Sequence, residues 1–164
     1  MRIIGIDPGL QRTGWGVLDV AGVRLSYVAH GVLASNARDS FETRLLTISQ
    51  GLEQLLCQWQ PHVAAVEEIY VNVNPRSTLK LGMARGACLL APARFGIPVA
   101  HLTPTNVKKS IVGSGRASKD QVAAMVKLLL GRADLSGTDA TDALGVAIAH
   151  AHYSQTLERM EISA

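Results

Sequence analysis

Four acidic residues stand where carboxylates could act together on a substrate. Asp7 and Glu67 each follow a short apolar run, while Asp139 and Asp142 lie three residues apart and would share one face of a helix. If the two apolar runs are neighbouring strands, the four carboxylates can converge at one edge of a sheet. Gathered like charges repel one another unless a cation holds them, and hard oxygen ligands suit Mg²⁺ or Mn²⁺. The spacing therefore indicates a divalent metal site.

Each carboxylate also has a purely structural explanation. Asp7 can shape an Asp-Pro-Gly turn, and Asp139 and Asp142 can favour the positive end of their helix. Taken one at a time, these explanations are the better ones. The hypothesis of a site depends on the four residues acting together, and on the charge of the rest of the chain.

The basic residues are concentrated in the middle of the chain. The net charge is only +3, from 16 lysines and arginines against 13 acidic residues, but no Asp or Glu occurs over residues 69–119. A solvated basic face explains this block as well as a nucleic-acid surface does, and the carboxylates outside it favour the second. An acidic site in a cationic protein fits metal-assisted phosphodiester cleavage, in which two ions about 4 Å apart activate water and stabilise the leaving oxygen.

The predicted elements would bring the first two carboxylates together. Residues 3–6 and 14–18 form a hairpin around the Asp-Pro-Gly turn, and residues 23–33 add a third antiparallel strand. An amphipathic helix capped by Ser40 then leads to a parallel strand over residues 62–66. Asp7 and Glu67 would both follow the carboxyl ends of strands.

The remaining elements complete an α/β pattern. They are a helix from about residue 75, a strand over 97–101, a helical turn at 103–104, a helix from Ser118 to Leu130, and a last helix from about Thr138 to Tyr153. The order predicts a mixed five-stranded sheet flanked by helices, with three antiparallel strands first and parallel strands after. This is the outline of a ribonuclease H-like fold.

The length and composition predict one compact unit. The chain has 164 residues, and we expect residues 1–154 to form a single nuclease domain followed by a flexible C-terminal tail over residues 155–164. No apolar run approaches the ~20 residues of a membrane span, and the opening residues read as a strand rather than a signal peptide. These features predict a cytoplasmic protein with no membrane partner.

Four sequence motifs occur in order between residues 5 and 144. They are Gly-Ile-Asp-Pro-Gly at 5–9 with Thr-Gly-Trp-Gly at 13–16, Val-Glu-Glu-Ile-Tyr at 66–70, Leu-Lys-Leu-Gly-Met-Ala-Arg-Gly at 79–86, and Thr-Asp-Ala-Thr-Asp-Ala-Leu at 138–144. Together they resemble the RuvC family of bacterial Holliday junction resolvases. The resemblance implies a structure-specific endonuclease that resolves Holliday junctions by paired, symmetric, metal-dependent nicks near the crossover, in homologous recombination and DNA repair.

The resemblance also implies roles for the acidic residues. Asp7, Glu67, Asp139 and Asp142 would be the catalytic residues and would hold two Mg²⁺ ions, for which Mn²⁺ could substitute. Asp7 would bridge both ions, Asp142 would help hold the ion that activates water, and Glu67 would hold the ion facing the leaving oxygen. Asp139 would complete the site, while Glu68 stands where relatives can carry Gln and is expected beside the site rather than in it.

A set of basic and aromatic residues is expected to bind DNA. Tyr70 follows the strand that carries Glu67, and an aromatic face at the unpaired crossover can replace base stacking of about 1–3 kcal/mol; the alternative is core filler. Relatives carry an aromatic here, often Phe. Lys119 is also expected to be catalytic, by offsetting charge at the scissile phosphate, the alternative being a surface lysine. The complete predicted set is Tyr70, Arg76, Lys80, Lys108, Lys109, Arg116 and Lys119.

Two equivalent cuts in a four-way junction imply a homodimer with two-fold symmetry. The helix that carries Gly82 and Gly86 is the expected interface, with apolar contacts from Leu79, Met83 and Leu90; the alternative is close packing of this helix on its own sheet. The resemblance further implies the RuvA and RuvB branch-migration proteins as partners.

Two other functions fit part of the sequence. The first hairpin also resembles the phosphate-binding hairpin of actin-like ATPases and sugar kinases, but that class needs two such domains. A non-catalytic binder of branched nucleic acid would use the basic block with a dead acidic site, and the intact carboxylates argue against it. Mg²⁺-dependent nicking of a four-way junction separates these functions from a nuclease.

Overall fold

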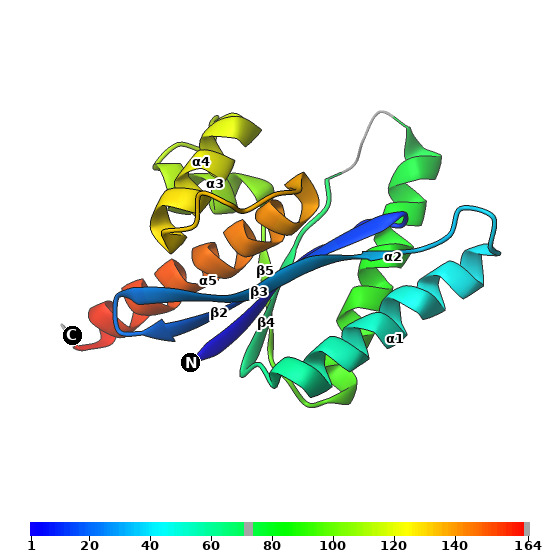
Figure 1. Ribbon diagram of the computed structural model, residues 1–164, viewed down its shortest axis with the longest axis horizontal. Helices are drawn as coiled ribbons and strands as arrows, with labels where there is room; N and C mark the ends of the chain where they lie inside the picture. The colour runs from blue at the N-terminus through cyan, green and yellow to red at the C-terminus, as the bar shows by residue number, and fades with distance from the viewer. Residues whose placement is uncertain (71–73, 163–164) are drawn as a thin grey trace.

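A mixed five-stranded sheet forms the centre of the molecule, in a computed structural model that describes residues 1–70 and 74–162 (Figure 1). Its strands are β1 (Arg2–Asp7), β2 (Arg12–Ala21), β3 (Arg24–Ala34), β4 (Val63–Glu67) and β5 (Val99–Leu102). Their spatial order is β3-β2-β1-β4-β5, with β1, β2 and β3 antiparallel and β4 parallel to both β1 and β5. The predicted sheet is confirmed.

Helices cover both faces of the sheet (Figure 1). They are α1 (Phe41–Trp59) and α2 (Pro75–Arg94) on one face, and α3 (Pro104–Val112), α4 (Lys119–Leu130) and α5 (Thr138–Ile162) on the other. Alternate residues of β1 point to opposite faces, so Ile4 and Ile6 join the core under α1 and α2, whereas Ile3 joins the core under α5. The sheet therefore separates two apolar layers.

The turn after Asp7 is held by one buried threonine. The Thr13 side chain has no exposed surface, and its hydroxyl donates to the carbonyl oxygen of Gly9 at 2.8 Å. The antiparallel register then places Gly14 opposite Asp7. A short, closed turn fixes the carboxyl end of β1, where the first acidic residue stands.

Glycines let α5 lie directly on β1 and β2. A Cβ on Gly5 would overlap the carbonyl oxygen of Ala143, and one on Gly14 would overlap the carbonyl oxygen of Asp139. Real Cβ atoms do not approach oxygen so closely, which means that these two strand positions require glycine. The first turns of α5, with Asp139 and Asp142, consequently lie beside the carboxyl end of β1.

The helix ends agree with the sequence at two caps and differ at the carboxyl end of α5. Ser40 caps α1, and Ser118 forms a capping box with Gln121 at the start of α4. The helix end predicted at Tyr153 is wrong, because α5 continues to Ile162. Residues after Tyr153 include good helix formers, which extend the helix without an apolar stripe.

The side chain of Gln155 also ties α5 to the β2–β3 turn, since its Nε2 donates to the carbonyl oxygen of Gly22 at 2.7 Å. The division into a domain over residues 1–154 and a flexible tail over 155–164 stays a prediction. Within the described part of the chain, no helix is both long and apolar enough to cross a membrane.

Candidate active site

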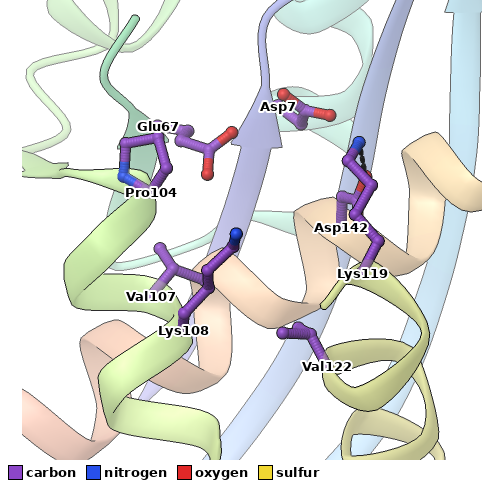
Figure 2. Close-up of a pocket in the computed structure, with 8 residues that line it drawn as sticks. All are labelled: Asp7, Glu67, Pro104, Val107, Lys108, Lys119, Val122 and Asp142. Atoms are coloured by element: carbon purple, nitrogen blue, oxygen red, sulfur yellow. Dashed lines mark hydrogen bonds and ion pairs between the residues drawn. The ribbon is translucent and has the colours of Figure 1, made fainter. Parts of the chain in front are cut away.

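A cleft of about 260 Å³ opens at the carboxyl ends of β1 and β4. Asp7 reaches it from β1, Glu67 from β4 and Asp142 from α5 (Figure 2). Lys108 of α3 and Lys119 of α4 face these carboxylates. Because β1 and β4 are parallel neighbours, their last residues leave the sheet at the same edge. The structure thus brings together three of the four acidic residues singled out from the sequence.

Burial makes two of these carboxyls unusually weak acids. Desolvation raises the pKa of Asp7 to about 6, and repulsion by Asp142 adds to the shift. Desolvation likewise raises the pKa of Glu67 to about 8, followed by the charge of Asp7 and a hydrogen bond with it. The charge of Lys119 opposes both shifts. Near neutral pH this pair therefore retains a proton unless a cation takes its place.

Lys119 is paired with Asp142 at the mouth of the cleft. Its Nζ donates to Oδ2 of Asp142 at 3.2 Å, and this hydrogen bond, with the attraction of the same carboxylate, raises the pKa of the lysine. The Lys119 side chain is 79% exposed and that of Asp142 22%, so the ammonium faces solvent while the carboxylate faces the cleft. A substrate phosphate entering the cleft would meet this ammonium.

Asp139 is placed differently from the other three acidic residues. It does not line the cleft, and its Oδ2 accepts a hydrogen bond of 2.6 Å from Nε of Arg12 at the start of β2. It is still close enough for its charge to raise the pKa of Asp7. Arg12 could not be singled out from the sequence, because its partner is 127 residues away along the chain.

The chemistry of the cleft fits a divalent cation, although no group of three His, Cys, Asp or Glu side chains in residues 1–70 and 74–162 is already arranged as a metal site. Asp7, Glu67 and Asp142 offer only carboxylate oxygens, the ligands that Mg²⁺ prefers. The raised pKa values of Asp7 and Glu67 also indicate that the cleft has too little positive charge for its carboxylates. A cation would supply that charge.

The residues predicted to bind DNA lie on several elements. Tyr70 is 58% exposed just beyond β4, so it is not core filler. Lys108 and Lys119 line the cleft itself. The remaining four are exposed at the start of α2, on α3 and in the α3–α4 connection, and they are Arg76, Lys80, Lys109 and Arg116.

Arg85 lies within the basic block and in the third motif, but its position in the sequence predicts no role for it. Its Nε donates to the carbonyl oxygen of Glu67 at 2.9 Å. The pattern of the sequence could not show this contact, because an arginine on a helix facing a sheet edge has many acceptors within reach.

The sheet order, the two helix layers and the carboxylates at the ends of adjacent parallel strands define a nuclease of the ribonuclease H-like class. The family model described as crossover junction endodeoxyribonuclease RuvC matches residues 3–150. The chain belongs to the RuvC family, as its four motifs predicted.

Relatives support this assignment over nearly the whole chain. The crossover junction endodeoxyribonuclease RuvC of Rhodospirillum rubrum is 53% identical over 93% of this chain and 90% of that protein. The structure of Thermus thermophilus RuvC in complex with a Holliday junction substrate matches with a TM-score of 0.89 and 32% identity, covering 95% of this chain and 96% of the other. The yeast mitochondrial Holliday junction resolvase Ydc2 shares the fold, with a TM-score of 0.68, 16% identity, and coverage of 96% and 82%.

Proposed function

We propose that this chain is an endodeoxyribonuclease that resolves four-way DNA junctions by paired, symmetric nicks near the crossover, in homologous recombination and DNA repair. The observation that carries the proposal is the convergence of Asp7, Glu67 and Asp142 on one cleft, in a chain that matches the RuvC family over residues 3–150. The similar Thermus thermophilus protein has been solved with a Holliday junction substrate, which supports the same substrate here.

Asp7, Glu67, Asp139 and Asp142 are proposed to hold two Mg²⁺ ions, for which Mn²⁺ can substitute. When bound, such ions activate a water molecule and stabilise the leaving oxygen. Asp7 is proposed to serve both ions, because it shares the cleft with Glu67 of β4 and with Asp142 of α5. The Oδ2 of Asp139 is bonded to Arg12, so Asp139 would join the site through its other oxygen, Oδ1, or after this ion pair opens.

The other residues of the cleft bind and orient the substrate. The ammonium of Lys119 lies beside Asp142 and can move to a phosphate oxygen, where it would offset the charge that develops in the transition state. Lys108 faces the same space from α3 and would hold the backbone. The proton retained by Asp7 and Glu67 leaves when positive charge enters the cleft, so metal binding should release it.

The proposed assembly is a homodimer through the outer face of α2. Leu79, Met83 and Leu90 of this face are 61%, 45% and 55% exposed. Among the residues that the structure describes, a Cβ on Gly86 would meet nothing within 4 Å, and one on Gly82 would meet only Ile69 at 3.6 Å, which gives little support to the alternative of close packing within the chain. The RuvA and RuvB branch-migration proteins are proposed partners by family resemblance, and junctions in bacterial chromosomes would place the protein in the cytoplasm.

Replacement of Asp7 by Asn tests the site. An amide would hold a divalent cation less well than the carboxylate does, and the change removes a charge that repels phosphates. We therefore expect nicking of a synthetic four-way junction to disappear while junction binding is kept or improved. Nicking is measured with Mg²⁺ on the junction and on a linear duplex, and binding is measured by gel shift without metal.

Near wild-type nicking by Asp7→Asn at saturating Mg²⁺ would show that the acidic site is assigned wrongly. Junction binding by the wild type without any nicking would support the non-catalytic binder instead. ATP hydrolysis without nicking would support the actin-like alternative.

A further inference from the structure

One arginine of α2 joins the helix to the strand end that carries Glu67. Arg85 lies on the side of α2 that faces the sheet and is half-buried. Its Nε donates to the carbonyl oxygen of Glu67 at 2.9 Å, and one terminal nitrogen, Nη2, contacts Nδ1 of His101 at 2.7 Å. A guanidinium has no acceptor, so this His101 nitrogen must accept the hydrogen bond. One rigid, planar group thus holds the ends of two strands.

The two contacts bridge neighbouring strands at the edge where the cleft opens. In the parallel register of β4 and β5, Val66 is opposite His101 and Glu67 is opposite Leu102. The backbone ladder continues one step further, since the amide of Glu68 donates to the carbonyl oxygen of Leu102 at 2.8 Å. The carbonyl of the same peptide group, that of Glu67, accepts from Arg85, so both polar groups of the last peptide that pairs with β5 have partners.

The same segment also passes close to α2 almost one turn earlier. A Cβ added to Gly82 would lie 3.6 Å from Cδ1 of Ile69. Gly82 is almost one helical turn before Arg85, so this close approach and the hydrogen bond from Arg85 lie on the same part of α2. The segment that carries Glu67 and leads to Tyr70 is therefore bonded to this helix at Arg85 and passes near it at Gly82.

We propose that Arg85 is a positioning residue that fixes the main chain at Glu67, and with it the direction of the Glu67 carboxylate, to α2. The inference rests on the proposed role of Glu67 as a metal ligand. Arg85 acts through the carbonyl group and does not touch the substrate. A displacement of about 1 Å in a reacting group can cost on the order of 100-fold in rate, so a clamp on the main chain has a large effect on the chemistry.

The test compares variants of Arg85 with a matched arginine on the same helix. Arg94 also lies on α2, and its ion pair with Glu53 at 2.9 Å is remote from the cleft. For Arg85→Ala we expect the rate of nicking at saturating junction and Mg²⁺ to fall about 100-fold, with junction affinity in metal-free buffer changed less than about threefold. Binding of Mn²⁺, measured by calorimetry, should weaken. Arg94→Ala should match the wild type in all three measurements.

Two further variants separate a positioning role of Arg85 from a general effect on stability. A lysine at position 85 can reach one acceptor but lacks the planar fork, so Arg85→Lys should recover part of the rate. His101→Ala removes one of the two contacts and should cause a smaller loss than Arg85→Ala. Should Arg85→Ala fail to fold, these two variants carry the same comparison.

Wild-type nicking by Arg85→Ala would overturn the inference if Glu67→Gln is inactive in the same assay. Equal rates for Arg85→Ala and Arg85→Lys, with a loss confined to thermal stability, would also overturn it. If Glu67→Gln itself nicks normally, then the proposed site is what fails, and the two failures remain distinguishable.

Discussion

At the residue scale, the raised pKa values of Asp7 and Glu67 make the stability of the cleft depend on pH. The pKa of Asp7 is raised from 3.8 to about 6 and that of Glu67 from 4.5 to about 8, chiefly by burial. Between the unfolded and folded values, the folded protein holds protons that the unfolded chain has lost. Stability from these groups is therefore complete below the unfolded pKa values and is lost as the pH rises through the folded ones.

We accordingly expect the free energy of unfolding of the metal-free protein to fall between about pH 4 and pH 8, measured by urea denaturation. Glu67→Gln cannot ionise at this position and should remove the upper part of the fall. Mg²⁺ at pH 8 should restore more stability to the wild type than to this variant, because the ion stabilises the ionised carboxylates. An unchanged pH dependence in Glu67→Gln would contradict the assignment of the shift to the cleft.

Some residues of the site could be identified from the sequence and others could not. Asp7 and Glu67 could be predicted as site residues because each ends a strand, and the ends of adjacent parallel strands meet at one edge of the sheet. The pairing of Asp139 with Arg12 depends on contacts between α5 and β2, which no local pattern encodes. The role proposed for Arg85 depends on a backbone carbonyl, which every residue has.

At the element scale, the short segment after β4 presents an aromatic side chain to solvent. Tyr70 is 58% exposed and follows Glu67, which lines the cleft, by three residues. We expect Tyr70→Ala to lower the rate of junction nicking by about fivefold or more, since a base stacked on an aromatic contributes about 1–3 kcal/mol. The free energy of unfolding should change by less than about 0.5 kcal/mol, as for most exposed positions.

Tyr70→Phe keeps the aromatic face and should retain activity. Tyr153→Ala removes another exposed tyrosine, 37% exposed on α5, and serves as the control. A loss of stability that matches the loss of nicking would mark Tyr70 as a structural residue, and unchanged nicking would exclude the wedge.

The elements themselves were predictable where side chains act locally. Ser40 and Ser118 each satisfy an amide at the start of a helix, a contact within three residues of sequence. The end of α5 was not predictable from its apolar pattern, because the helix continues to Ile162 through a sequence that lacks an apolar stripe. The close packing of α5 on the sheet depends on Gly5 and Gly14. The sequence alone does not show why these positions are glycine, because the atoms that exclude a Cβ belong to α5.

At the scale of the whole molecule, the layers follow from the order of the elements. Three strands joined by short turns form an antiparallel unit, and two strands reached through helices add to it in parallel. The order of the elements does not predict how two molecules assemble. An apolar helix face can pack against a partner subunit as well as against the core of its own subunit. The exposure of Leu79, Met83 and Leu90 favours a partner subunit.

The change Gly82→Arg tests this assembly. Within residues 1–70 and 74–162, only Ile69 lies near a Cβ at position 82, at 3.6 Å, so an arginine fits in the single subunit. A charge between two closely approaching helices would not be accommodated. We expect the variant to sediment as a folded monomer and to lose coordinated double nicking, even where single nicks persist.

Leu128→Arg is the matched control for this variant. It places the same charge on a side chain of α4 that is 72% exposed, and it should leave a dimer that nicks both strands together. Coordination is read from a junction in a supercoiled plasmid, since two nicks made within one binding event linearise the plasmid and separate nicks relax it first. If Gly82→Arg remains dimeric and linearises the plasmid normally, the outer face of α2 is not the interface, and its exposed apolar side chains must serve another contact.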